Sequence, residues 1–188
     1  APVQGEKPLK VDDAAAKAVK GVTHVIPLPY GVAVIGTTVE ATKKAKAALK
    51  VEWSKTAPAR SYDSEKLAAE YLAIARDEKK ESVLAHKHGD PAAAIAGAAK
   101  VVGGEYVSDH VAHATMEPMN ATAKFADGKF EIWAPTQASG LIQVVGAHVF
   151  KTTPDKITVH TTFLGGGFGR RFELDFAFDA MGLAMATG

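Results

Sequence analysis

The chain has 188 residues, of which 47% are hydrophobic and 23% are charged. Its 22 Lys and Arg balance 21 Asp and Glu, which argues against nucleic acid or an anionic membrane as a partner, because both attract concentrated positive charge. Without cysteine it can form no disulfide and offers no thiolate to zinc or an iron–sulfur cluster. No apolar run reaches the roughly 18 residues of a membrane helix.

The first third of the chain predicts a β-β-α-β unit that ends near Ser54. Residues 21–36 contain two β-rich runs around a Pro-Tyr-Gly turn, which is typical of a hairpin. Residues 37–50 follow as an amphipathic helix that either of its first two threonines can cap. Residues 51–53 then predict a return strand. The N-terminus lacks the apolar segment of a signal peptide, so we expect any export signal to be removed or never present.

The remainder mixes helices and strands without an internal repeat, which favours the α+β class. Polar residues 55–63 predict a linker, so the expected domains are 1–54 and 64–188. The expected elements after the linker are a helix at 64–78, a short strand from 81, a helix opened by Asp90 and Pro91, a strand from 101, a strand at 129–136, a helix at 137–150, a strand at 156–167 and a closing helix at 173–188.

The most informative stretch is TTFLGGGFGRRFELDF, residues 161–176. The order of strand, glycine-rich loop and helix presents backbone N–H groups to an anion. A Walker A loop is excluded because Arg170 and Arg171 stand where it needs Lys and Ser or Thr. The dinucleotide fingerprint fails as well, because Arg170 occupies its last glycine position.

Two interpretations of this loop stay open on the residues alone. It is either a tight turn without a ligand or the binding site of a phosphate or a pterin substituent. The two arginines are either solvated, or one of them pairs with Glu173 or Asp175, or they bind such an anion.

Three side chains upstream suggest a metal site, but their context argues against it. His110, His113 and Glu117 have helical spacing, as in some zinc sites. Pro118 and the β-rich residues before His110 oppose a helix, so we expect a structural role in a turn and no protein ligand to a metal. Trp133 is expected to be a core residue of its strand.

Three motifs in order make the chain resemble a known family. FLGGGFGRRFELDF, HVAHATMEPMNATAKFADGKFEIWAPTQ and VAVIGTTVEATKKAKAALKVEW resemble the molybdopterin-binding large subunit of the xanthine dehydrogenase and aldehyde oxidase family. The nearest branch is the isoquinoline 1-oxidoreductase beta subunit and related bacterial aldehyde dehydrogenases. The resemblance implies a partial hammerhead β-β-α-β unit followed by part of a molybdopterin-binding α+β domain.

The resemblance also implies the reaction and the site residues. Members of this family oxidise or hydroxylate an aldehyde or an N-heterocycle with water as the oxygen source. Phe168 and Gly169 would lie beside the molybdenum, and the side chain of Gln137 would reach toward its oxo group. An amide suits this role because it donates a hydrogen bond without titrating. The expected cofactor-binding residues are Gln137, Gly166, Gly167, Phe168, Gly169 and Arg170.

The family's large subunits are several times longer than this chain. Their general-base glutamate is expected beyond Gly188, so no catalytic residue is assigned within the chain. We therefore expect a fragment or one polypeptide of a split subunit that is inactive alone. The expected partners are the remainder of the large subunit, a small subunit with two [2Fe–2S] clusters and, in some relatives, a cytochrome, but neither nucleic acid nor an inserted membrane.

The resemblance further implies the cytosine dinucleotide form of molybdopterin and a periplasmic location, with the cytoplasm as the alternative. Two other functions remain open at this point. One is a non-catalytic interaction or assembly module of the same family. The other is an independent anion- or nucleotide-binding domain that uses the glycine loop as a phosphate nest.

Overall fold

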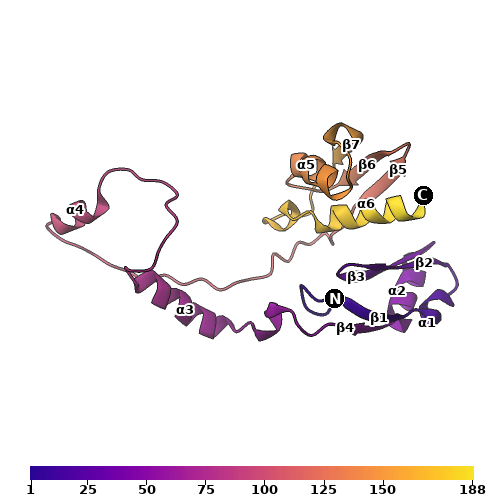
Figure 1. The fold of residues 1–188 in the computed structure, drawn as a ribbon, viewed down its shortest axis with the longest axis horizontal. Helices are drawn as coiled ribbons and strands as arrows, with labels where there is room; N and C mark the ends of the chain where they lie inside the picture. The colour runs from indigo at the N-terminus through magenta and orange to yellow at the C-terminus, as the bar shows by residue number, and fades with distance from the viewer. The chain divides into compact units, whose positions relative to one another are not determined.

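The computed structural model describes all 188 residues, which divide into two compact units, Ala1–Asp109 and His110–Gly188 (Figure 1). Both units combine helices with small sheets, which confirms the predicted α+β class. No helix is both long and apolar enough to cross a membrane. The finer boundaries at residues 54 and 63 stay a prediction.

The first unit begins with two antiparallel strand pairs. Its elements are β1 (Pro8–Asp12), α1 (Ala14–Lys17), β2 (Val22–Leu28), β3 (Gly31–Gly36), α2 (Val39–Ala48) and β4 (Lys50–Trp53). The predicted hairpin is formed by β2 and β3, and Thr38 caps α2 by accepting a hydrogen bond from the Ala41 N–H at 3.1 Å. The return strand β4 instead pairs with β1, a strand that the sequence analysis missed.

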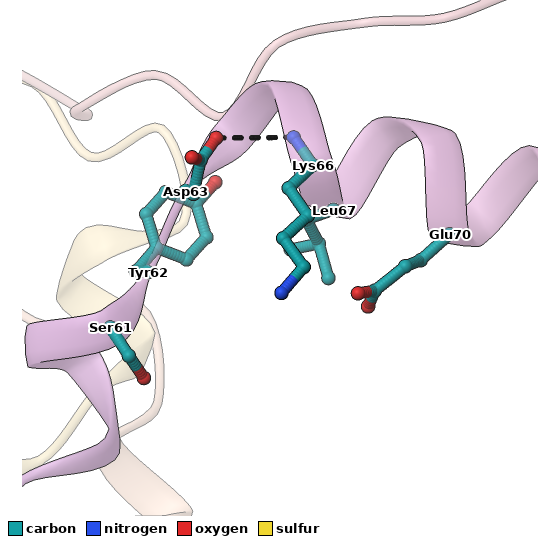
Figure 2. A pocket seen from close by; sticks show the side chains of 6 residues that line it. All are labelled: Ser61, Tyr62, Asp63, Lys66, Leu67 and Glu70. Atoms are coloured by element: carbon teal, nitrogen blue, oxygen red, sulfur yellow. Dashed lines mark hydrogen bonds between the residues drawn. The ribbon is translucent and has the colours of Figure 1, made fainter.

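The rest of the first unit contains a 3₁₀ turn and two helices. These are η1 (Pro58–Ser61), α3 (Ser64–Arg76) and α4 (Pro91–Ala96). Asp63 caps α3 and Asp90 caps α4, because each carboxylate accepts from N–H groups of the first helical turn. Figure 2 shows the start of α3, where Ser61, Tyr62, Asp63, Lys66, Leu67 and Glu70 line a shallow hollow of about 120 Å³.

Two predicted strands are wrong. No strand lies between α3 and β5, although residues from 81 and from 101 are rich in β-formers. A strand needs a partner that accepts its backbone hydrogen bonds, and these segments find none in the chain. Apolar residues of both segments are exposed, and Val83 and Tyr106 are almost fully so.

The second unit has a three-stranded sheet in the order β5-β6-β7. The elements are β5 (Thr122–Ala126), β6 (Lys129–Ala134), α5 (Ser139–Val149), η2 (Pro154–Lys156), β7 (Ile157–Thr161), η3 (Arg170–Phe172) and α6 (Asp175–Thr187). The strands β6 and β7 are parallel, and α5 is the crossover helix that connects them. Predicted and observed helix α5 differ by two residues at the start, and β7 ends at Thr161, before the glycines.

The core of this unit lies on one face of the sheet. Phe130, Ile132 and Ala134 alternate along β6 and pack with Ile142 of α5 and Met181 of α6. The alternation explains why the prediction for Trp133 is wrong.

Trp133 lies one position out of phase with the buried residues of β6, so its side chain belongs to the opposite face of the sheet. There it is only partly buried and stacks on the ring of His160, with ring centroids 4.9 Å apart. Because β6 and β7 are parallel, both strands end at the same edge of the sheet. The segments that form the candidate site continue from that edge.

Candidate functional site

The loop of residues Gly165–Gly169, here called the glycine loop, connects β7 to η3 and α6. Gly166, Phe168 and Gly169 have φ angles of 96°, 52° and 92°. The turn is closed by hydrogen bonds from the Arg170 N–H to the Gly167 carbonyl and from the Phe172 N–H to the Gly169 carbonyl. A positive φ is costly for a bulky residue such as Phe168, and such strain is concentrated at ligand sites. Phe168 is 73% exposed.

The glycine loop leaves three backbone donors unused. The Gly165 N–H donates to the Glu117 carboxylate at 2.9 Å, and the Gly169 N–H donates to the Gln137 Oε1 at 3.2 Å. The N–H groups between them, at residues 166–168, donate to no group of this chain. Successive unpaired N–H groups in such a turn form an anion-binding concavity.

Gln137 lies directly against this loop. It follows β6, and its backbone N–H donates to the Arg171 carbonyl at 3.1 Å. A Cβ on Gly167 would stand 2.7 Å from the Gln137 Oε1, so only glycine lets the side chain lie there. Because the oxygen accepts from Gly169, the carboxamide NH₂ remains as a free donor.

Arg170 pairs with carboxylates, which was one of the open alternatives. Its guanidinium makes two hydrogen bonds to Asp175, at 2.9 and 2.7 Å, and lies 3.3 Å from Glu173. These hydrogen bonds hold the pKa of Asp175 below its ordinary value. The pair joins the end of the loop to the first turn of α6, and a direct cofactor contact by Arg170 stays a prediction.

The ion pair between Arg171 and Glu117 was not predicted from the sequence. The Arg171 side chain is fully buried, and its Nη2 donates to the Glu117 Oε2 at 2.6 Å. We expected any carboxylate partner of the arginines to be Glu173 or Asp175. The signal in the sequence was the lone Glu117 between two methionines, but nothing local connects it with a residue 54 positions later.

The three side chains that suggested a metal site, His110, His113 and Glu117, are not gathered into one cluster. No group of three or more His, Cys, Asp or Glu side chains is placed to hold a metal ion. His113 lies beside the glycine loop, since its Nε2 is 3.7 Å from where a Cβ on Gly169 would stand. No helix forms between residues 110 and 121, as Pro118 indicated.

Stability should depend on pH through Glu117. The Gly165 N–H, the Asn120 amide and the charge of Arg171 hold the pKa of Glu117 below its ordinary value, against the effect of partial burial. A carboxyl with a lowered folded pKa stabilises the fold above its unfolded pKa of about 4.3, and this stabilisation is lost as the pH falls through the folded value.

We therefore expect the unfolding free energy of the second unit to fall below about pH 4.3, and to fall less steeply in Glu117→Gln. Urea titrations between about pH 6 and 3, followed by Trp133 fluorescence in a Trp53→Phe background, would measure both curves. Parallel curves for the two proteins would contradict the assignment to Glu117.

Comparison with known proteins identifies the class of domain. Residues 75–188 match the family model of the molybdopterin cofactor-binding domain. The chain is 38% identical over 193 residues to the isoquinoline 1-oxidoreductase subunit beta of Brevundimonas diminuta, covering all of this chain and 25% of that protein. It is 30% identical over 193 residues to a membrane-bound aldehyde dehydrogenase (pyrroloquinoline-quinone) of Gluconacetobacter polyoxogenes. That match covers 98% of this chain and 24% of the relative.

Solved structures agree in fold. Quinoline 2-oxidoreductase from Pseudomonas putida 86 matches with a TM-score of 0.67 at 20% identity, covering all of this chain and 29% of that one. Aldehyde oxidoreductase from Desulfovibrio gigas matches with a TM-score of 0.69 at 19% identity. That match covers 97% of this chain and 24% of the other. The chain therefore belongs to the molybdopterin cofactor-binding family of oxidoreductases, which confirms the resemblance seen in its motifs. It spans about a quarter of the length of its curated relatives.

Proposed function

We propose that this chain forms part of the molybdopterin site of a molybdenum hydroxylase that acts on an aldehyde or an N-heterocycle with water as the oxygen source. The observation that carries the proposal is the junction of Gln137 with the glycine loop. The loop offers three unused N–H groups, and the fixed carboxamide adds a free NH₂ next to them. These donors fit a group rich in phosphate and other acceptor oxygens.

In this proposal, residues of the glycine loop and Gln137 each have a role in binding the cofactor. Gly166, Gly167 and Phe168 would bind the cofactor through their N–H groups, and Gly169 would fix the orientation of Gln137. The Gln137 NH₂ would donate to an acceptor on the cofactor at any working pH, because an amide does not titrate. Arg170, whose guanidinium is paired with Asp175, would hold the end of the loop to the first turn of α6 beside the cofactor. When bound, the molybdenum cofactor supplies the two-electron oxidation itself.

The finer features of the assembly belong to the same proposal. The chain would work with the remainder of a large subunit, which fits its coverage of a quarter of the curated relatives. A small [2Fe–2S] subunit and in some cases a cytochrome would accept electrons. The cofactor would be the cytosine dinucleotide form, and the enzyme would be periplasmic.

Replacing Gln137 with alanine is expected to lower cofactor retention about tenfold, since it removes the NH₂ donor and the acceptor of the Gly169 N–H. Molybdenum content and oxidised-pterin fluorescence should be measured on the chain co-expressed with the rest of its subunit. Gln143→Ala is the matched control. Gln143 donates to the Ile157 carbonyl in the same unit, away from the loop, so retention should stay unchanged.

The same measurement separates the proposal from its alternatives. An assembled wild-type subunit without molybdenum and pterin would overturn the proposal and favour an assembly module. Nucleotide binding that survives Gln137→Ala, without any pterin, would favour an independent anion-binding domain, because a phosphate nest does not need the carboxamide.

A further inference from the structure

Arg171 is the largest fully buried side chain of the protein. Burying a guanidinium costs free energy unless its charge is paired and its N–H groups are satisfied. An apolar side chain of similar size could fill the same space without that cost. The charge therefore calls for an explanation other than filling the core.

The guanidinium connects three segments that are distant in the sequence. Its Nε donates to the Gly166 carbonyl at 2.7 Å, within the glycine loop. Its Nη1 donates to the Pro135 carbonyl at 3.4 Å, two residues before Gln137. Its Nη2 donates to both the backbone carbonyl and the carboxylate of Glu117, at 3.0 and 2.6 Å. Only the planar fork of arginine can serve acceptors in so many directions.

Glu117 and the Arg171 backbone complete the connection. The Glu117 Oε2 also accepts from the Gly165 N–H, and its Oε1 accepts from the Asn120 amide at 3.0 Å. The Arg171 carbonyl accepts from the Gln137 N–H. One residue thus holds the loop through its side chain and the Gln137 segment through its backbone.

The geometry points to Arg171 and Glu117 as positioning residues for the cofactor site. They fix the glycine loop against the Gln137 segment before any ligand arrives, so that the free N–H groups and the carboxamide need not be ordered on binding. Ordering flexible groups lowers affinity, and a preorganised site avoids that loss. This inference rests on the proposed function only for the identity of the ligand.

The test replaces the ion pair with apolar side chains of similar size in the double variant Glu117→Leu/Arg171→Met. Such replacements usually preserve folding. Amide hydrogen exchange of the 188-residue chain, followed by NMR, should show the β6 amides unchanged. The Gly169 N–H, which contacts neither replaced side chain, should lose protection about tenfold or more. Gln143→Ala, which removes a side-chain donor of the same unit outside the loop, should leave this protection unchanged.

Unchanged Gly169 protection in a folded double variant would overturn the inference. Should the double variant not fold, Asn120→Ala serves instead, because it removes only the amide that holds the Glu117 Oε1. A fall of about threefold in Gly165 and Gly169 protection is then expected. No change at either amide would overturn the inference in this variant as well.

The cofactor is measured separately in the complete subunit. A wild-type subunit that retains pterin and a double variant that loses it would support the inference. Equal retention in both, with the loop loosened in the variant, would overturn the positioning role. A wild-type subunit without pterin would defeat the proposed function, whereas the exchange result would still decide whether Arg171 and Glu117 hold the loop.

Discussion

Arg171→Met is expected to lower the unfolding free energy of the second unit by about 3 kcal/mol, the largest effect predicted for a single substitution in this chain. The substitution removes charge-assisted hydrogen bonds to Gly166, Pro135 and Glu117, and it leaves the Gly166 and Pro135 carbonyls without this donor. This loss of unfolding free energy lies at the lower end of the range for a broken buried ion pair, because the Glu117 side chain is 31% exposed and water can reach it.

Urea denaturation followed by Trp133 fluorescence in a Trp53→Phe background would measure this loss in the second unit alone. The adjacent Arg170→Met is the matched control. Arg170 is 25% exposed, and its partners Asp175 and Glu173 are about half exposed, so its removal should cost at most about 1 kcal/mol. Equal losses for the two variants would contradict the distinction between a buried and a surface pair.

Gly165→Ala is expected to destabilise the second unit by about 2–3 kcal/mol, through a steric clash. A Cβ at this position would stand 2.4 Å from the Glu117 Cβ. Glu117 cannot simply turn away, because its backbone N–H donates to the Gly165 carbonyl at 3.2 Å and its carboxylate accepts from the Gly165 N–H. The two segments must separate, and both hydrogen bonds weaken.

Gly140→Ala provides the control for this prediction. Gly140 is in the first turn of α5, and a Cβ there would meet nothing within 4 Å. Alanine favours the helix, so this variant should gain up to about 1 kcal/mol. Thermal unfolding of the two variants should therefore shift in opposite directions. A Gly165→Ala protein as stable as the wild type would show that the glycine loop and Glu117 are not held as closely as described.

The features predicted correctly from the sequence are those set by near neighbours. The Pro-Tyr-Gly turn specifies the β2–β3 hairpin, and Thr38 and Asp90 each begin a helix by accepting from an N–H group three residues away. The alternation along β6 likewise follows from the period of a strand. The strands predicted from residues 81 and 101 failed, because β propensity forms no strand without a partner.

The α+β class, most of the helices and strands and, through three ordered motifs, the family could therefore be predicted from the amino-acid sequence. The way in which the candidate site is held together became visible only in the folded chain. The Gln137 carboxamide meets Gly169 across 32 positions, and Arg171 meets Glu117 across 54. No local pattern encodes such contacts, because they form only when the sheet and its crossover helix bring the ends of β6 and β7 to one edge.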